Sequence, residues 1–169
     1  MPLTGKFVVM GVSRCGKSSV GAAISECLGT RYIDGDDLHP PVNVMKVSRG
    51  EPLTDADRAP WQDMIGQQPA AIDGTVVNGC SALKRTYRDI IRGNTGEPVC
   101  FLHLTGSRDV LSERMSNRSG HFMPVSLLDS QLATLEPPDL DETAITANID
   151  QPVDQLVNTL VAKIRERRP

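Results

Sequence analysis

The sequence from residue 7 to residue 18 reads Phe7-Val8-Val9-Met10-Gly11-Val12-Ser13-Arg14-Cys15-Gly16-Lys17-Ser18. It opens with a continuous apolar run that is rich in β-branched residues, which is typical of a strand buried on both faces. The glycine-rich remainder satisfies the pattern G-x-x-x-x-G-K-[ST] of a phosphate-binding loop. The motif stands between a predicted strand and a predicted helix, and this context favours nucleotide binding over an ordinary glycine turn.

Each residue type that the motif specifies has a physical role. Gly11 and Gly16 allow backbone angles and a close approach that a Cβ would block, so that successive N–H groups point into one concavity. Lys17 can reach the β- and γ-phosphates of a nucleotide, and the Ser18 hydroxyl can bind Mg²⁺. We expect a nucleotide to be held here by Gly11, Ser13, Arg14, Cys15, Gly16, Lys17, Ser18 and Ser19.

The pattern predicts an alternation of strands and helices along the whole chain. An apolar stripe at Val20, Ala23, Ile24, Cys27 and Leu28 predicts a helix from Lys17 that Gly29 caps. A similar stripe from Val153 to Ile164 predicts a last helix with Pro152 at its first turn. Short apolar runs predict further strands at 32–33, 75–77, 99–104 and 144–147. This order favours a parallel sheet with helices on both faces, in one domain spanning residues 1–169.

The middle of the chain carries a helix start signal. Thr54 and Asp57 have the spacing of a capping box, and Pro69 must end or kink the helix that follows. The run Gln67-Gln68-Pro69 predicts that this helix is interrupted and short.

Two acidic residues follow the second predicted strand. Asp34 and Asp36 are two positions apart, so in an extended chain both carboxylates project from one face. Ligands of open parallel sheets bind at this end of the strands. One carboxylate could support Mg²⁺, and the other could orient or deprotonate an attacking hydroxyl. The alternative is that Asp34-Gly35-Asp36-Asp37 is only a turn, since Asp and Gly favour turns.

Basic side chains come in pairs after predicted strands. Lys84 and Arg88 have i, i+4 spacing, as do Arg114 and Arg118, and each pair can share one helix face. Taken singly, each is better explained as a solvated surface charge. The pairs favour anion binding because a phosphate-binding loop is present. The segment from Ser119 to Pro124 suits a flap that closes over phosphates and excludes water.

The ring side chains divide into two groups. His103 lies in an apolar run, so we interpret it as a core or strand-end histidine with its hydrogen bonds satisfied, and we interpret Trp61 as a packing residue. His39 and His121 lie in predicted loops, where contact with a ligand is plausible.

Composition limits the class of protein. The chain has 169 residues, of which 39% are hydrophobic and 23% charged, and a formal net charge of −3. These values exclude disorder as the dominant state and argue against a nucleic-acid-binding surface, which needs a basic excess. No apolar stretch approaches the ~18 residues of a membrane helix, and we expect no signal peptide. The four cysteines lack metal-ligand spacing and are expected to be reduced thiols of a cytoplasmic protein.

Several further motifs support a family resemblance when taken in order. They are Asp34-Gly35-Asp36-Asp37-Leu38-His39-Pro40, Gly50-Glu51-Pro52-Leu53-Thr54-Asp55, Arg58-Ala59-Pro60-Trp61, Cys80-Ser81-Ala82-Leu83-Lys84 with Tyr87-Arg88-Asp89, and Gly120-His121-Phe122. Together with the phosphate-binding loop, they resemble the small bacterial-type gluconokinases, among the shikimate-kinase-like and adenylate-kinase-like P-loop kinases. The match extends from about Lys6 to the last helix.

This resemblance implies a fold and a reaction. The expected fold is a three-layer P-loop kinase with a five-stranded parallel sheet in the order 2-3-1-4-5 and a mobile lid at about 115–130. The expected reaction is ATP-dependent phosphorylation of D-gluconate at the 6-hydroxyl, with Mg²⁺, in the cytoplasm and without a membrane or nucleic-acid partner. A homodimer is also possible, because dimers are common in the family.

The resemblance also implies roles for single residues. Lys17, Asp36 and Arg118 would be catalytic, and Ser18 and Asp34 would hold the metal. Arg114, Arg118, Gln151 and Pro152 would add contacts to the nucleotide. The residues expected to contact the acceptor are Asp36, His39, Arg58, Lys84, Arg88 and His121.

Two alternatives remain at this stage. One is a related kinase for another acceptor, such as shikimate or a different sugar acid. The other is a nucleotide switch, because Asp63-Met64-Ile65-Gly66 spells the Asp-x-x-Gly of such proteins. That tetrapeptide lies in a helical pattern rather than after a strand, and the chain has no Asn-Lys-x-Asp motif for guanine, so we favour the kinase.

Overall fold

The computed structural model describes residues 5–12, 15–117 and 125–167. Five strands form one parallel sheet in the order β2-β3-β1-β4-β5, as the resemblance implied. The strands are β1 Lys6–Met10, β2 Arg31–Asp34, β3 Val76–Gly79, β4 Val99–Thr105 and β5 Ala144–Asn148. All five predicted strands are therefore present, each within a residue or two of its predicted ends.

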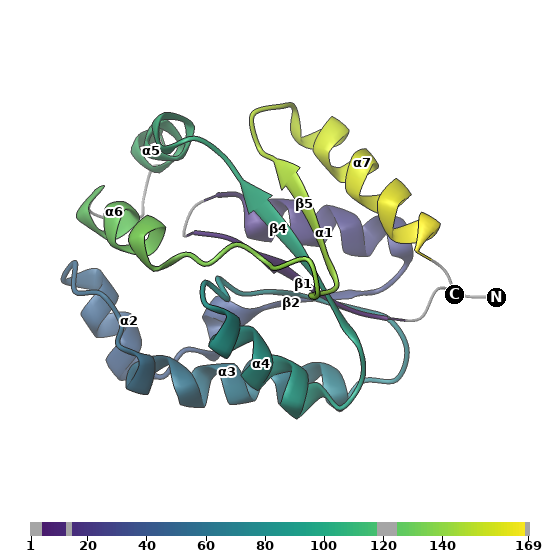
Figure 1. The fold of residues 1–169 in the computed structure, drawn as a ribbon, viewed down its shortest axis with the longest axis horizontal. Coiled ribbons are helices and arrows are strands. Elements are labelled where there is room, and N and C mark those ends of the chain that lie inside the picture. Colours follow the sequence, from purple (N-terminus) through teal and green to yellow (C-terminus); the bar gives the residue numbers. More distant parts are fainter. Residues whose placement is uncertain (1–4, 13–14, 118–124, 168–169) are drawn as a thin grey trace.

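The helices complete a three-layer architecture (Figure 1). Helices α1 and α7 cover one face of the sheet, and α3 and α4 cover the other. Helices α2, α5 and α6 lie beyond the carboxyl ends of the strands, at the left of Figure 1. The helix bounds are α1 Lys17–Leu28, α2 Pro41–Ser48, α3 Asp55–Ala70, α4 Arg85–Thr95, α5 Arg108–Asn117, α6 Val125–Thr134 and α7 Val153–Glu166, with a 3₁₀ turn η1 at Gly35–Leu38.

Strand β1 is the centre of the sheet and the centre of the core. All five of its residues are buried, because β3 and β4 flank it and helices cover both of its faces. Phe7 and Val9 pack toward α1 and α7, whereas Val8 and Met10 pack toward α3 and α4. Lys6, at the start of the strand, donates to the carbonyl oxygens of Ile72 and Gly74, and the other four residues are apolar, as burial on both faces favours.

The predicted helix ends are confirmed in detail. Gly29 caps α1 in the left-handed conformation, with φ of 66°. Thr54 and Asp57 form both hydrogen bonds of the capping box, at 3.1 and 2.9 Å. Pro152 is the N-cap of α7, one position before the first turn in which it was predicted. No helix in the described part of the chain is long and apolar enough to cross a bilayer.

Three expectations about helices were wrong. Helix α3 was expected to be interrupted and short, but it is continuous over 16 residues; Pro69 lies in its last turn, and the helix ends at Ala70, directly after it, as predicted. The buried stripe of α1 includes Gly21 and Ser25, and Cys27 is exposed. Val153 is 42% exposed at the start of α7, so the stripe that packs on the sheet begins at Leu156.

Candidate active site

The phosphate-binding loop connects β1 to α1. Gly11 and Gly16 have φ of +149° and +102°, which residues with a Cβ rarely adopt. A Cβ on Gly11 would also lie 2.7 Å from the Leu104 carbonyl oxygen. Helix α1 begins directly after Gly16, and the first N–H groups of a helix, which have no partner within the helix, favour an anion. Ser13 and Arg14 lie outside the described residues.

Lys17 is held over this loop. Its side chain is buried, and its ammonium donates hydrogen bonds to the carbonyl oxygens of Gly11 at 3.2 Å and Val12 at 2.9 Å. Two of its three protons are thus directed, which fixes the position of the charge at the mouth of the loop. Cys15, beside it, is fully buried, and burial raises the pKa of its thiol. Ser19 lies exposed on the first turn of α1.

The two predicted metal-binding residues are neighbours in space. The Ser18 hydroxyl donates a 2.9 Å hydrogen bond to Oδ2 of Asp34, the last residue of β2. A hydroxyl and a carboxylate are hard oxygen ligands of the kind Mg²⁺ takes, usually with water and phosphate oxygens as further ligands. The described residues hold no cluster of three His, Cys, Asp or Glu side chains that could bind a metal alone.

Asp36 lies in the 3₁₀ turn that follows β2. The structure describes its backbone, and its side chain lies outside what is described. The preceding Gly35 is pressed against the end of β3, since a Cβ there would lie 2.1 Å from the Gly79 carbonyl oxygen. Trp61 reinforces this contact by donating from Nε1 to the Gly35 carbonyl at 2.7 Å. The turn is therefore fixed to the sheet and to α3.

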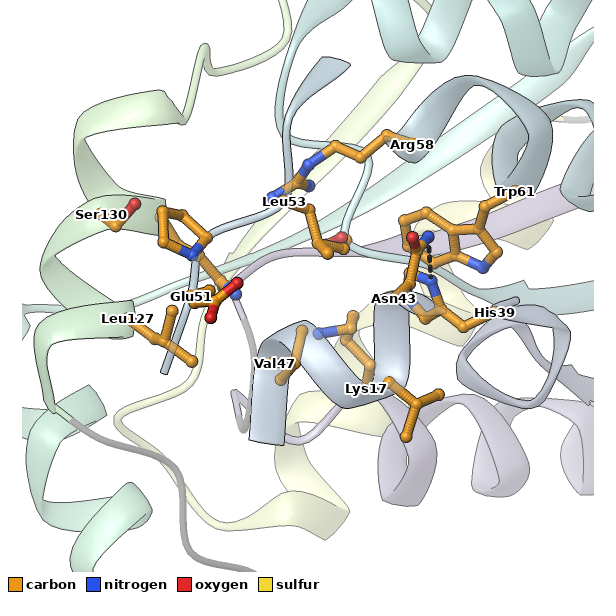
Figure 2. Close-up of a pocket in the computed structure, with 14 residues that line it drawn as sticks. Lys17, His39, Asn43, Val47, Glu51, Leu53, Arg58, Trp61, Leu127 and Ser130 are labelled. Carbon is orange, nitrogen blue, oxygen red and sulfur yellow. Dashed lines mark hydrogen bonds between the residues drawn. The ribbon is translucent and has the colours of Figure 1, made fainter. Parts of the chain in front are cut away.

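A cavity of about 330 Å³ lies between α2, α3 and α6 and reaches the phosphate-binding loop (Figure 2). This volume is within the usual range of small-molecule sites. Of the predicted site residues whose side chains the structure describes, Lys17, His39 and Arg58 line it. The other lining residues are Asn43, Val44, Val47, Glu51, Pro52, Leu53, Trp61, Ser81, Leu127, Ser130 and Gln131.

Arg58 supplies a buried positive charge to the cavity. It is 5% exposed, and its Nε has no hydrogen-bond partner among the described residues. Its guanidinium carbon lies 5.3 Å from the centre of the Tyr87 ring, a cation–π distance. Burial lowers the pKa of Arg58, while Tyr87 opposes that effect. A buried cation with a spare donor is well suited to an anionic ligand.

His39 is held against Trp61. The two rings are stacked with centroids 3.7 Å apart, and Nδ1 of His39 lies 3.2 Å from Nδ2 of Asn43. Burial, with a smaller contribution from the Arg58 charge, lowers the pKa of His39 to about 4. The imidazole is therefore neutral at physiological pH. Trp61 is a buried packing residue, as predicted, and it also forms part of the cavity wall.

Lys84 and Arg88 do not line the cavity. Lys84 is the N-cap of α4 and forms an ion pair of 3.1 Å with Asp55, which also accepts a hydrogen bond from Tyr87. Arg88 is fully buried and makes a bidentate pair with Glu142, at 2.7 and 3.0 Å. It also donates to the carbonyl oxygens of Ala82 and Leu83. Arg88 thus secures the loop after β3, and the structure gives no support to its predicted contact with an acceptor.

The other predicted nucleotide contacts lie near the carboxyl end of β5. Arg114 donates to the Ile149 carbonyl at 2.6 Å, and its Nη1 lies 3.6 Å from where a Cβ of Gly16 would be. Gln151 donates to the Asn148 carbonyl at 2.6 Å, just before Pro152 and α7. Arg114 and the 149–152 loop therefore lie on the α5 side of the phosphate-binding loop. Arg118 and His121 lie outside the described residues.

The sequence did not single out Asn43 or the apolar wall of the cavity. Helix α2, which carries Asn43, Val44 and Val47, was not predicted at all. Pro41 at its first turn was the available signal, since proline is favoured there. The helix has only eight residues and two cavity-facing valines, a pattern too short for periodicity to detect.

Comparison with known proteins identifies the family. The chain is 48% identical to the gluconokinase of Gluconobacter oxydans (strain 621H) over 159 residues, which cover 92% of this chain and 88% of that protein. The chain belongs to the gluconokinase family. It is also 45% identical to the thermosensitive gluconokinase of Escherichia coli (strain K12), over 82% of this chain and 75% of that one. No model of a protein family matched the chain.

Solved structures agree with the gluconokinase assignment. A gluconokinase from Sinorhizobium meliloti 1021 superposes with a TM-score of 0.91 at 48% identity, covering 98% of this chain and 94% of that one. Shikimate kinase from Aquifex aeolicus superposes with a TM-score of 0.63 at 12% identity, a likeness that concerns the fold alone. The expected shikimate-kinase-like fold is thereby confirmed.

Proposed function

We propose that this chain transfers the γ-phosphoryl group of ATP to the 6-hydroxyl of D-gluconate, giving 6-phosphogluconate and ADP. The observation that carries the proposal is that one cavity is lined both by Lys17 of the phosphate-binding loop and by the buried cation Arg58. An acceptor in this cavity can place one end near a phosphate and its charged end on an arginine. The family membership and the gluconokinase relatives support the same acceptor.

The nucleotide would lie on the loop from Gly11 to Ser19. The backbone N–H groups of the loop and the Lys17 ammonium would hold the phosphates. Arg114, next to Gly16, would reach the nucleotide from α5. Ser18 and Asp34 would hold Mg²⁺, which neutralises charge on the phosphates when it is bound. The hydrogen bond between these two residues supports this role, because it brings both oxygen donors to one point.

The acceptor would be bound by charge and by hydroxyl contacts. Gluconate is a monoanion with several hydroxyls, so its site needs a cation together with neutral polar groups. Arg58 provides the cation, and its Nε has no partner among the described residues. His39 provides a neutral polar group, and the apolar wall from α2 and α6 would keep water away from the reacting phosphoryl group.

The reaction would be an in-line displacement with little covalent work for the protein. Lys17 would stabilise charge on the transferring group, and Asp36 would align or deprotonate the acceptor hydroxyl. Arg118 and His121 would complete the site from a lid at about 115–130. These last three roles rest on the resemblance, and we expect the protein to act in the cytoplasm, where ATP is available.

A coupled ATPase assay with a panel of acceptors tests the proposal. We expect ADP release with D-gluconate and at most a few per cent of that rate with shikimate, other sugar acids or D-glucose. Phosphorus NMR of the product should show a phosphate monoester at carbon 6. Turnover of another acid in preference to gluconate would contradict the proposal that gluconate is the acceptor. ATP hydrolysis that no acid accelerates would contradict the kinase assignment and favour a nucleotide switch. The position of Asp63-Met64-Ile65-Gly66 inside α3, rather than after a strand, argues against such a switch.

A further inference from the structure

Asn43 has one side-chain atom that the protein does not satisfy. This residue is 1% exposed and lines the cavity from α2. Its amide nitrogen donates to the Asp57 carbonyl oxygen at 2.9 Å and lies 3.2 Å from Nδ1 of His39. Its Oδ1 has no hydrogen-bond partner among the described residues. Leaving such an acceptor buried and unpaired costs about 1–3 kcal/mol.

The contact with Asp57 settles which way the Asn43 amide faces. A carbonyl oxygen only accepts hydrogen bonds, so the Asn43 atom that faces Asp57 must be the NH₂ group. The same NH₂ group faces His39, and it can only donate. Nδ1 of His39 must therefore be the unprotonated nitrogen, and in the neutral ring the proton is on Nε2.

The surroundings keep this ring neutral and fixed. Burial and the Arg58 charge from α3 hold the pKa of His39 at about 4. Lys46 of α2 and Asp57 of α3, whose backbone carbonyl accepts from Asn43, neutralise each other in a 2.6 Å ion pair. Trp61 stacks on the ring and fixes its plane. His39 can therefore offer Nε2–H as a donor.

We propose that Asn43 and His39 together recognise the hydroxyls of the acceptor: Oδ1 of Asn43 accepts a hydrogen bond from one hydroxyl, and Nε2–H of His39 donates to a neighbouring oxygen. Figure 2 shows the two side chains joined by their hydrogen bond at the edge of the cavity, with Trp61 behind them. In this arrangement Asn43 has two tasks, because its NH₂ group sets the tautomer of His39 while its oxygen binds substrate. The proposal rests on the proposed function, since it takes the cavity to be the acceptor site.

The pair predicts a particular kind of selectivity. A site that hydrogen-bonds a substrate hydroxyl strongly rejects an analogue that lacks it, because its own polar group is then left unpaired. A series of mono-deoxy gluconates should therefore contain at least one member whose kcat/KM is reduced by about 100-fold or more. That member lacks the hydroxyl that Asn43 accepts from.

Nitrogen NMR tests the tautomer without any need for activity. The chain has three histidines, and protein labelled with ¹⁵N-histidine should show His39, identified by its absence in His39→Gln, with Nε2 protonated and Nδ1 not protonated at pH 7.5. Asn43→Asp, which places an acceptor opposite Nδ1, should move the proton to Nδ1. A wild-type ring protonated at Nδ1, or one that averages both tautomers, would overturn the assignment.

Kinetics test the substrate contact. In Asn43→Leu the KM for gluconate should rise by about 10–100-fold, with the KM for ATP changed by less than about twofold, and the penalty against the discriminating deoxy analogue should disappear. Ser48→Ala, on the same helix and outside the cavity, should retain wild-type selectivity. If Asn43→Leu does not fold, Asn43→Ala, which removes the same oxygen with a smaller side chain, serves in the same comparison.

The outcomes separate the two proposals. If Asn43→Leu slows all the acids equally, so that their ratios match wild type, Asn43 is structural and this inference is wrong. If the wild-type chain phosphorylates no sugar acid at all, the proposed function is wrong, and the substrate contact falls with it. The NMR result would then still decide the Asn43–His39 arrangement on its own.

Discussion

The Ser18 hydroxyl donates a hydrogen bond of 2.9 Å to Oδ2 of Asp34, and this bond joins the first turn of α1 to the last residue of β2. The two residues are sixteen positions apart in the chain. They meet because β1 and β2 are both parallel members of one sheet, with β3 between them, so their carboxyl ends lie at the same edge. A serine at the N-terminus of a helix and an aspartate at the end of a strand thus bring two oxygen atoms together that can bind a metal ion.

Replacement of Asp34 by Asn tests this pair as a magnesium site. The change removes a charge that attracts Mg²⁺ and keeps the size of the side chain. We expect the Mg²⁺ concentration for half-maximal activity to rise by about tenfold or more. Titration of activity with Mg²⁺ at saturating ATP measures this. Asp37→Asn is the matched control, because Asp37 is exposed in the same turn. Equal effects of the two changes would exclude a specific role for Asp34.

Asp36 is expected to act on the acceptor hydroxyl. Asp36→Asn should lower kcat by at least ~100-fold, because an amide cannot accept the proton, while ATP binding measured by calorimetry stays within about threefold of wild type. Wild-type turnover would remove Asp36 from the mechanism, and loss of ATP binding would place it at the nucleotide instead.

Arg58 is expected to bind the carboxylate of the acceptor. Arg58→Met keeps much of the buried stem and removes the charge, so the KM for gluconate should rise by about 100-fold. Arg108→Met makes the same change in charge at an exposed ion pair and should leave the KM unchanged. Lys84→Met tests the expectation from the sequence that Lys84 contacts the acceptor. If this change raises the KM for gluconate more than Arg58→Met does, then Lys84 leaves Asp55 and binds the carboxylate.

The buried pair of Arg88 and Glu142 is expected to stabilise the fold. Their side chains are 0% and 1% exposed, so removal of Arg88 takes the bidentate partner from a buried carboxylate and leaves it the partly exposed Arg92. Arg88→Met should lower the free energy of unfolding by about 3–5 kcal/mol. Arg88→Met combined with Glu142→Gln should be less destabilised than the sum of the single changes, because the uncompensated charge is then absent. Urea unfolding measures all four proteins, and strict additivity would exclude the coupling.

Stability should fall as the pH is lowered from 6.5 toward 4. Burial lowers the pKa of both His39 and His103 to about 4, whereas in the unfolded chain each titrates near its ordinary value of 6.5. Between these values the unfolded state binds more protons, so the free energy of unfolding decreases by up to about 1.4 kcal/mol per pH unit for each histidine. Both contributions are fully present above pH 6.5.

His103→Leu should weaken this dependence on pH. His103 is 3% exposed as expected of a core residue, but the prediction that its hydrogen bonds are satisfied was wrong, because neither ring nitrogen has a partner among the described residues. The leucine variant should therefore be at least as stable as wild type at pH 7 and should lose stability more slowly on acidification. Urea unfolding at pH 7.5, 6.5, 5.5 and 4.5 measures both proteins. A wild-type stability that is constant over this range would contradict the assignment. Glu142 affects stability only at lower pH. Burial opposes its ionisation, but hydrogen bonds from Arg88 and Arg92 hold its pKa at about 2.

Local sequence patterns predicted the strands and most helix ends well, but they predicted the hydrogen-bond and ion-pair partners of side chains poorly. The capping box at Thr54 and Asp57 was predictable because both of its hydrogen bonds join residues three positions apart. Lys84 and Arg88 have the spacing of a shared helix face, yet their carboxylate partners come from Asp55 and Glu142, which are 29 and 54 positions away. The expected homodimer and the lid at 115–130 stay predictions.

The chain's own sequence determined the βαβ frame, the phosphate-binding loop and the placement of acids after β2, because strand burial, helix capping and glycine backbone freedom act over a few neighbouring residues. Only the tertiary structure decided which polar groups share the cavity. Arg58 enters it while Arg88 does not, and Asn43 joins His39 there, because the packing of α2 and α3 on the sheet chooses which buried donors and acceptors the protein satisfies itself and which it leaves for a ligand.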